Sequence, residues 1–123
     1  MSSVFTKIIN GEIPCYKIYE DDKTFVFLDN SPVVRGHTLV VPKVEVDKIY
    51  DLEDEDYLAL MRTAKKISKH LEEKLGTRIF WKVMGTEVPH AHIHLTPQDD
   101  SYGQPLSLTP DEFEEIRAKL CYN

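Results

Sequence analysis

The sequence predicts an α+β fold: a mainly antiparallel five-stranded sheet with one long helix, a short N-terminal helix and a C-terminal helix. Three observations lead to this prediction. Short runs rich in β-branched and aromatic residues follow one another early in the chain, a long central segment has helical spacing, and a capped helical segment comes near the end. Strands joined by short turns pair antiparallel. We expect the helices to pack on one side of the sheet.

The N-terminal part of the chain should form a short helix and then three strands. Ser3 is a good N-cap and Gly11 stands just past the last apolar position, which predicts a helix over residues 3–9. Asp21 and Asp22, between two apolar runs, indicate a hairpin turn. The predicted strands cover residues 16–19, 24–28 and 37–41.

The rest of the chain should supply the long helix, two more strands and the terminal helix. Residues 54–75 have apolar side chains at helical spacing, and Gly76 marks the end of the helix. Residues 78–83 and 88–97 predict the last two strands. Thr109, Pro110 and Glu112 form a capping box with proline at the first helical position. The apolar positions of the two helices are Leu58, Met61, Ala64, Ile67, Leu71 and Leu75, and Phe113, Ile116 and Leu120.

Length and composition predict one domain, residues 1–123, because no linker or repeat divides the 123 residues. The net charge of −6 disfavours a nucleic-acid partner. No apolar run reaches the roughly 20 residues that cross a bilayer, so no membrane partner is expected. The start lacks the pattern of a secretory signal, and Cys15 and Cys121 have no ligand or disulfide spacing. We therefore expect a cytoplasmic protein with two free thiols.

The stretch VPHAHIHLTP holds three of the five histidines, at alternate positions 90, 92 and 94. In a strand, successive side chains point to opposite faces, so the three imidazoles would share one face while Ala91, Ile93 and Leu95 face the core. A single histidine there would be an ordinary solvent-facing residue. Three of them on one face indicate a functional site.

Two kinds of chemistry fit such a row of imidazoles. Zinc binding is one, but the outer two residues would lie about 13 Å apart along a strand, too far to converge on one ion. Nucleophilic attack on phosphorus is the other, because a neutral imidazole attacks near pH 7 and a neighbouring imidazolium donates to phosphate oxygen or the leaving group. The central histidine is then the best candidate nucleophile, flanked by charge-assisted donors.

Residues 90–96, His-Ala-His-Ile-His-Leu-Thr, resemble the motif of the histidine triad (HIT) superfamily until the last position. FTKIINGEIPCYKIYEDDKTFVFLDNSP and GHTLVVPK, upstream in the same order, are similar to the Hint-type branch of nucleoside phosphoramidases. The resemblance covers roughly residues 4–97 and leaves 98–123 as a C-terminal extension. In the family, the region after the triad often approaches the partner's active site, so residues 99–105 and the terminal helix are candidates for specificity by analogy.

The resemblance implies a HIT fold, a homodimer, and hydrolysis or transfer of nucleoside monophosphates from an amine or another phosphate. It gives His92 the role of nucleophile, with a nucleotidyl-histidine intermediate. His90 would orient that ring through its backbone carbonyl, His94 would contact phosphate or the leaving group, and His37 would support the site.

The resemblance also implies a purine-nucleotide pocket. Asp29 matches the acid that binds ribose hydroxyls, and the loop 85–88 should lie beside the phosphate. Glu87 stands where a small hydroxyl residue is common, so we expect phosphoramidates to be preferred over dinucleoside polyphosphates. The apolar residues around the base would be Val4, Phe5, Ile8 and Phe27, with Asn30 at an often aliphatic position. The loop residues are Gly85, Thr86, Glu87 and Val88.

No cofactor is required by this scheme. Some relatives carry a structural zinc on a Cys-x-x-Cys and a later histidine, but Ser3, Thr6 and the stretch Val44-Glu45-Val46 occupy these positions, so a zinc site is not expected. Three alternatives stay open. They are a dinucleoside polyphosphate hydrolase, a non-catalytic nucleotide-binding module, and a small histidine metal site.

Overall fold

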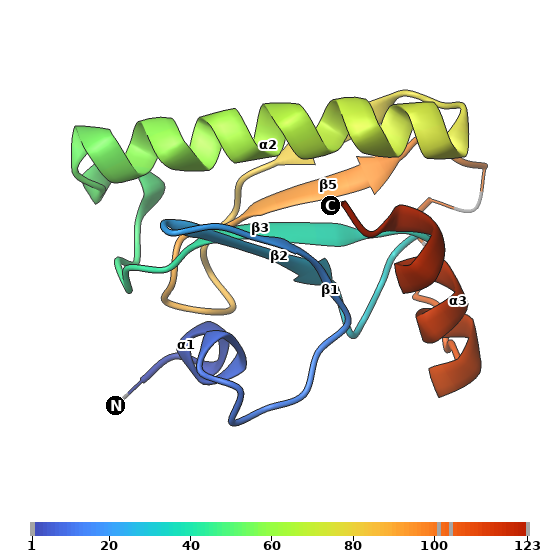
Figure 1. Cartoon of the computed structure of the whole chain (residues 1–123), viewed down its shortest axis with the longest axis horizontal. Helices are drawn as coiled ribbons and strands as arrows, with labels where there is room; N and C mark the ends of the chain where they lie inside the picture. The colour runs from blue at the N-terminus through green and yellow to red at the C-terminus, as the bar shows by residue number, and fades with distance from the viewer. Residues whose placement is uncertain (1, 101, 104, 123) are drawn as a thin grey trace.

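The computed structural model describes residues 2–100, 102–103 and 105–122, and it has the predicted α+β class (Figure 1). The helices are α1 (Val4–Ile9), α2 (Asp54–Leu75) and α3 (Pro110–Leu120), with a 3-10 turn, η1 (Ile49–Asp51). The strands are β1 (Lys17–Glu20), β2 (Thr24–Leu28), β3 (Thr38–Pro42), β4 (Ile79–Lys82) and β5 (Ile93–Pro97). The predicted bounds of β2 and α2 match, and those of the other strands differ by a few residues.

The five strands form one antiparallel sheet in the order β1-β2-β3-β5-β4. The first three strands are neighbours in sequence. The chain then crosses the sheet through α2, and β5 pairs with β3 while β4 forms the outer edge. In the β3–β5 register Leu39 lies opposite His94, so side chains near the end of β2, β3 and β5 can meet on one face.

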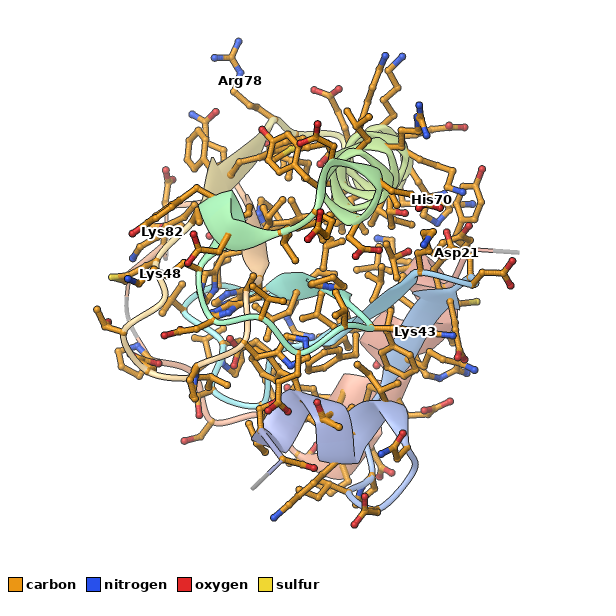
Figure 2. The ribbon with its side chains drawn as sticks, turned by 90° about the vertical axis from the view of Figure 1, so that its left-hand side faces the viewer. Asp21, Lys43, Lys48, His70, Arg78 and Lys82 are labelled. Atoms are coloured by element: carbon orange, nitrogen blue, oxygen red, sulfur yellow. The ribbon has the colours of Figure 1, made fainter. Side chains whose placement is uncertain are left out.

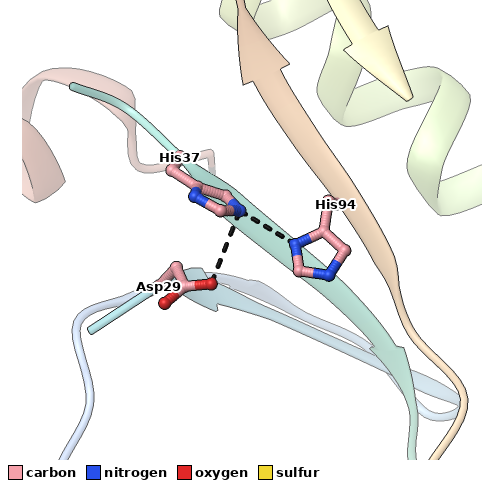
Figure 3. Close-up of side chains that lie close together, drawn as sticks. All are labelled: Asp29, His37 and His94. Atoms are coloured by element: carbon pink, nitrogen blue, oxygen red, sulfur yellow. Dashed lines mark hydrogen bonds and ion pairs between the residues drawn. The ribbon is translucent and has the colours of Figure 1, made fainter. Parts of the chain in front are cut away.

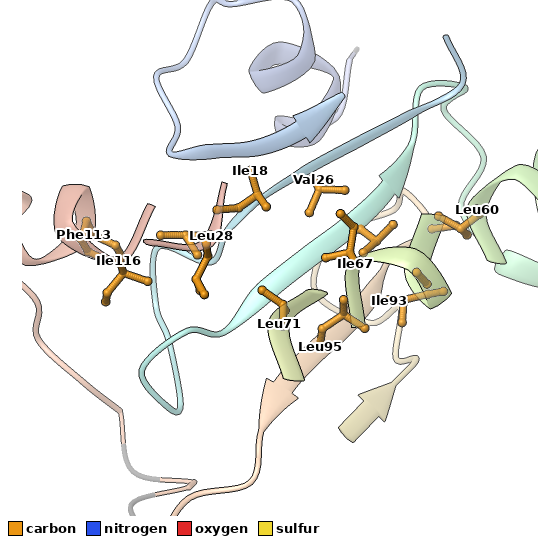
Figure 4. Close-up of a cluster of buried hydrophobic side chains, with 14 of the residues drawn as sticks. Ile18, Val26, Leu28, Leu60, Ile67, Leu71, Ile93, Leu95, Phe113 and Ile116 are labelled. Atoms are coloured by element: carbon orange, nitrogen blue, oxygen red, sulfur yellow. The ribbon is translucent and has the colours of Figure 1, made fainter. Parts of the chain in front are cut away.

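The main hydrophobic core lies between the sheet and α2 (Figure 4). Alternate strand residues such as Val26, Val40 and Ile93 point to this face, where Ile67 and Leu71 of α2 cover them. Helix α3 closes one end of the same core with its predicted apolar residues. Just after the helix, the Tyr122 backbone amide donates to the Ile18 carbonyl at 2.9 Å. The α3 residues in this core are Phe113, Ile116 and Leu120.

Helix α1 lies on the opposite face of the sheet from α2 (Figure 1), so the expectation that all helices pack on one side is wrong. The reason is that β2 and β3 are buried along their whole length. Phe25, Phe27 and Leu39 point away from α2 and need a cover of their own, which Phe5 and Ile8 of α1 provide.

Local signals account for the ends of the helices. The Ser3 side chain accepts from the Thr6 backbone amide, and the Thr109 capping box with its proline is formed at α3. Gly76 ends α2 at φ 71°, in the left-handed region. Five of the six predicted apolar positions of α2 lie in the core or pack against it, and Leu58 is the exception, because it is 47% exposed while Leu60 is buried. No helix in the described ranges combines the length and the apolar character that crossing a membrane requires.

The histidine stretch is a regular strand only from Ile93 onward, so the prediction of a strand over 88–97 is wrong for its first half. The His90 amide instead donates to the Val88 carbonyl at 2.8 Å, and the Ala91 amide donates to the Val46 carbonyl at 2.7 Å. The backbone amides of these two residues therefore bond to a turn and to the loop after β3, and not to a neighbouring strand. The alternation is still kept, because Ala91, Ile93 and Leu95 all lie in the α2-side core.

Candidate active site

The α1 face of the sheet brings together three polar side chains, one from β5 and two from the residues that directly follow β2 and precede β3 (Figure 3). The same alternation that buries Phe27 and Leu39 on this face places Asp29 and His37 there, and His94 comes from β5. His37 Nε2 lies 2.9 Å from His94 Nδ1 and 3.4 Å from Asp29 Oδ2. Residues 57 positions apart in the chain are thus joined in one network.

The hydrogen-bond partners of His37 determine the tautomers of this network. The Val33 backbone amide donates to His37 Nδ1 at 3.2 Å, so neutral His37 must carry its proton on Nε2. That proton is donated to His94 Nδ1, with the Asp29 carboxylate as a longer second acceptor. Neutral His94 therefore carries its own proton on Nε2, which makes that atom a hydrogen-bond donor.

His92 has the opposite arrangement. Its Nδ1 lies 2.7 Å from the His90 carbonyl oxygen, which can only accept, so Nδ1 carries the proton. Nε2 then keeps its lone pair and has no hydrogen-bond partner among the described residues. The ring packs edge-on against His94 at 4.9 Å and against Phe5 at 5.0 Å between centroids. His92 is therefore held as an oriented, unprotonated nitrogen base beside an N–H donor.

Burial keeps the neighbouring imidazoles neutral. The pKa of His94 is lowered to about 4, first by burial and then by the adjacent His92 and His37. Burial also lowers the pKa of His37, against the opposing effect of Asp29. The expectation of charge-assisted imidazolium donors therefore does not fit the free protein, in which His94 offers a neutral N–H.

We expect the free energy of unfolding to fall as the pH is lowered from 6.5 toward 4. Because the pKa of His94 is about 4 in the folded chain and 6.5 when unperturbed, the unfolded chain binds more protons across this range. The contribution is complete above pH 6.5 and is lost as the pH falls toward 4, by about 2 kcal/mol for this partly buried group. Urea unfolding at several pH values measures it. His94→Asn should show a shallower decline, and an equally steep one would contradict the assignment.

Asp29, His37 and His94 also offer ligand atoms within 4.8 Å of one another, as a metal site would. The donor set does not fit, because a metal on His37 Nε2 would force a proton onto Nδ1, directly against the Val33 amide donor. At the positions of the relatives' zinc ligands, Ser3 and Thr6 present hydroxyl groups, which are outside the usual thiolate, imidazole and carboxylate donors of zinc. The absence of a structural zinc stays a prediction.

A cavity of about 220 Å³ opens beside this network. His92 and His94 line it, and so do Asp29 and His37. The loop between β4 and β5 contributes Thr86 and Glu87, two of the residues that the resemblance assigns to the phosphate side. The structure thus places the predicted nucleophile, ribose acid and phosphate loop around one space.

Other predicted residues lie beside the cavity or away from it. His90 is fully buried, and Val88 is half-buried against the α1-side cluster. Gly85 is exposed. Of the residues predicted to surround the base, Phe5, Ile8 and Phe27 are buried between α1 and the sheet. Val4 is 42% exposed, and Asn30 is exposed.

Sequence reasoning missed Lys82, which lies in the cavity wall at the edge of the sheet, on the opposite side from His70 of α2 (Figure 2). Lys82 pairs in register with His94, and its charge helps to lower the pKa of both His94 and His37. Its ammonium group forms no ion pair within the described residues. Strand alternation in 78–83 could have predicted its face but not its partner. Of the candidate specificity region 99–105, Tyr102 lines the cavity, and residues 101 and 104 lie outside the described residues.

Comparison with known proteins gives a consistent picture. A protein of Schizosaccharomyces pombe named adenosine 5'-monophosphoramidase is 32% identical over 98% of this chain and 99% of its own length. An uncharacterized HIT-like protein of Borreliella burgdorferi is 33% identical over 98% and 96%. The crystal structure of a HIT-like protein from Bartonella henselae has a TM-score of 0.87 and 27% identity, covering 97% of this chain and 93% of that one. The family model of the HIT domain matches residues 10–101, so this chain belongs to the HIT domain family.

Proposed function

We propose that this protein hydrolyses nucleoside monophosphate conjugates, with phosphoramidates such as adenosine phosphoramidate as substrates, through a nucleotidyl-His92 intermediate. The observation that carries the proposal is the fixed tautomer of His92, whose Nδ1–H is bound to the His90 carbonyl and whose Nε2 lone pair is free. The name of the S. pombe relative supports the same substrate class.

The site can perform the reaction in two displacement steps. His92 Nε2 attacks the α-phosphorus, an N–P bond forms, and the bond from phosphorus to the leaving amine breaks. The leaving amine takes a proton from a water molecule in the cavity, to which the neutral Nε2–H of His94 can donate a hydrogen bond. A second water then attacks the nucleotidyl-histidine and gives its proton to the hydroxide left by the first step. The N–P bond breaks, and the nucleoside monophosphate leaves with the Nε2 lone pair of His92 restored. No metal takes part in these steps.

Asp29 is the proposed ribose-binding residue. Its Oδ1 accepts from the Ser31 backbone amide at 2.7 Å, and its Oδ2 lies near His37, so the carboxylate is held in a fixed orientation in the cavity wall. Each oxygen keeps further acceptor capacity for a ribose hydroxyl. Phe5 and Ile8 lie on the same face of the sheet and are the proposed neighbours of the base.

Mixing the protein with adenosine phosphoramidate tests the proposal. We expect steady release of adenosine monophosphate and, at short times, an adenylyl adduct in the intact-protein mass. Nucleotide binding with neither signal, there or with diadenosine polyphosphates, would favour a non-catalytic binding module. Stoichiometric metal in the purified protein would favour the histidine metal site.

The two charges in the cavity wall predict opposite effects on the choice of leaving group. Glu87 disfavours an anionic leaving group such as a phosphate, whereas Lys82 favours it and so supports dinucleoside polyphosphates as second substrates. We expect Glu87→Gln to shift the ratio of kcat/KM about 3- to 10-fold toward polyphosphates, and Lys82→Met to shift it about as far toward phosphoramidates. Steady-state rates on both substrates measure the ratio. An unchanged ratio in either variant would remove that residue from the account.

We also propose that the protein is a homodimer in which a second copy pairs with the free edge of β4. That strand is the outer strand of the sheet, and its backbone groups on the open side can pair with another strand. Apolar side chains along and after it are exposed, namely Phe80, Trp81, Val83 and Met84. Such a row is typical of an interface.

Light scattering after gel filtration should give twice the monomer mass for the wild type. Val83→Asp should shift the protein toward monomer, because it places a charge at the proposed interface. Val44→Asp is the matched control, since Val44 is similarly exposed, 40% against 50%, but follows β3, which β5 separates from the edge strand β4. Dissociation by both variants, or by neither, would contradict the β4 interface.

A further inference from the structure

The first residues of the chain are joined to the histidine triad by a buried hydrogen bond. Ser3 Oγ lies 2.8 Å from His90 Nδ1, although the two residues are 87 positions apart. Ser3 is 7% exposed and His90 is fully buried. The same Ser3 oxygen accepts from the Thr6 backbone amide at 3.1 Å as the N-cap of α1. One hydroxyl thus connects the start of α1 to the first triad histidine.

Glu45, from the loop after β3, joins this network from the other side. Its Oε1 accepts from the Ser3 backbone amide and from the Thr6 hydroxyl, both at 2.7 Å. These bonds lower the pKa of the Glu45 carboxyl, with the Ser3 amide as the first cause. The ionised carboxylate therefore holds the N-terminus of α1 against the loop after β3.

The partners of His90 determine which of its two ring nitrogens carries the proton. His90 Nε2 lies 2.8 Å from the Pro42 carbonyl oxygen and must donate to it. Nδ1 is then an acceptor, and its nearer donor is the Ser3 hydroxyl at 2.8 Å, with the Thr6 hydroxyl farther away at 3.5 Å. The Thr6 hydroxyl gives its proton to Glu45. The His90 ring is consequently fixed at both nitrogens, by a donor and an acceptor from two separate segments.

The backbone carbonyl of His90 links this network to the His92 ring. The His90 carbonyl accepts the Nδ1–H of His92 at 2.7 Å, and the next amide, of Ala91, is itself bound to the Val46 carbonyl. Phe5, in the first turn of α1, packs edge-on against both His90 and His92, with centroids 5.7 and 5.0 Å away. A shift of α1 would therefore also move the His90 ring and change the direction of the His90 carbonyl.

We propose that Ser3 and Glu45 are positioning residues that aim the Nε2 lone pair of His92 by holding the ring and carbonyl of His90. The proposal rests on His92 being the nucleophile of the proposed function. Without the Ser3 hydroxyl, the remaining donor for His90 Nδ1 is the Thr6 hydroxyl at 3.5 Å, whose proton goes to Glu45. The His90 ring is then held less firmly, and the carbonyl that selects the His92 tautomer loses its fixed direction. Because neither Ser3 nor Glu45 lines the cavity, nucleotide binding should be spared.

Kinetics of Ser3→Ala and Glu45→Ala test the proposal. We expect kcat to fall at least about tenfold for Ser3→Ala and less for Glu45→Ala, because small misplacements of a reacting group are costly. KM should stay within about twofold, because the nucleotide contacts are unchanged. Ser3→Thr, which keeps the hydroxyl, should restore most of the rate. A kcat within twofold of wild type in both alanine variants would overturn the proposal.

Matched controls separate positioning from loss of stability. Thr63→Ala removes a buried hydroxyl of α2 that lies 2.8 Å from the Thr24 hydroxyl, and it should cost a similar amount of stability without lowering kcat. Glu53→Ala removes another exposed glutamate, which makes no capping bond. If the controls lower kcat as much as Ser3→Ala and Glu45→Ala do, the network has no positioning role.

The tautomer of His92 gives a readout that needs no turnover. Nitrogen chemical shifts of the imidazoles should show the proton of His92 on Nδ1 in the wild type and a mixture of both tautomers in Ser3→Ala. An unchanged tautomer in Ser3→Ala would overturn the inference even in an active enzyme. If the wild type had no activity, the proposed function would fail, and the same spectra would still decide whether Ser3 orients His92.

Discussion

Replacing His92 by asparagine is expected to lower the release of adenosine monophosphate by at least about 10⁴-fold and to abolish the adenylyl adduct. Asparagine can still donate its amide N–H toward the His90 carbonyl, where the Nδ1–H of His92 donates at 2.7 Å. It has no nitrogen lone pair to attack phosphorus. The loss should therefore reflect the missing nucleophile and not a disturbed fold.

The matched control is His70→Asn on α2. His70 Nε2 donates to the Leu120 carbonyl at 2.9 Å, so this variant loses a comparable hydrogen bond outside the site and should keep its rate. Pre-steady-state mass spectrometry with adenosine phosphoramidate, together with product release, compares the two variants. More than a tenth of the wild-type rate in His92→Asn, or an adduct on another residue, would show that a different group attacks.

Leu71→Ala is expected to lower the free energy of unfolding by about 3 kcal/mol, whereas Leu58→Ala should cost less than about 1 kcal/mol. Both changes remove the same atoms from the same helix. Leu71 is fully buried between α2 and the sheet, and Leu58 is 47% exposed. The difference should come from the lost contacts of Leu71 and the cavity left behind.

Urea denaturation at one protein concentration measures both variants. The slopes of the transitions should agree with that of the wild type, so that the midpoints compare stability alone. Equal losses in the two variants would mean that Leu58 is buried after all, as the sequence predicted.

Much of the fold was accessible from local signals. Helix α2 has the predicted bounds, because acids at its start, apolar spacing and Gly76 at its end all agree. The α3 cap is equally local, since Thr109 and Glu112 satisfy each other within one turn. The alternation of Ala91, Ile93 and Leu95 also predicted the core-facing side chains. These features depend on neighbours in sequence, which a pattern can represent.

The failures concern partners that are distant in sequence. Periodicity treats the three histidines alike, yet His90 is sealed in by Pro42 and Ser3, and His92 is tied to the His90 carbonyl. The apolar runs of β2 and β3 are continuous, so they could not indicate that α1 covers the second face. Lys82 reaches the cavity only because of the β4–β5 register. The sequence predicted which residues lie around the cavity better than it predicted the contacts between them.

Because β5 lies between β3 and β4, we expect the site to form late in folding. The β1-β2-β3 meander and the β4-β5 hairpin close short loops, whereas pairing of β3 with β5 brings together segments on either side of α2 and carries a larger entropic cost. The contact between His37 and His94 joins the two segments that this pairing of β3 with β5 brings together. A chain with both local units formed would contain every histidine and still have no oriented nucleophile. Recovery of activity on refolding should therefore report the pairing of β3 with β5. A chain that has formed only the two local units should be inactive.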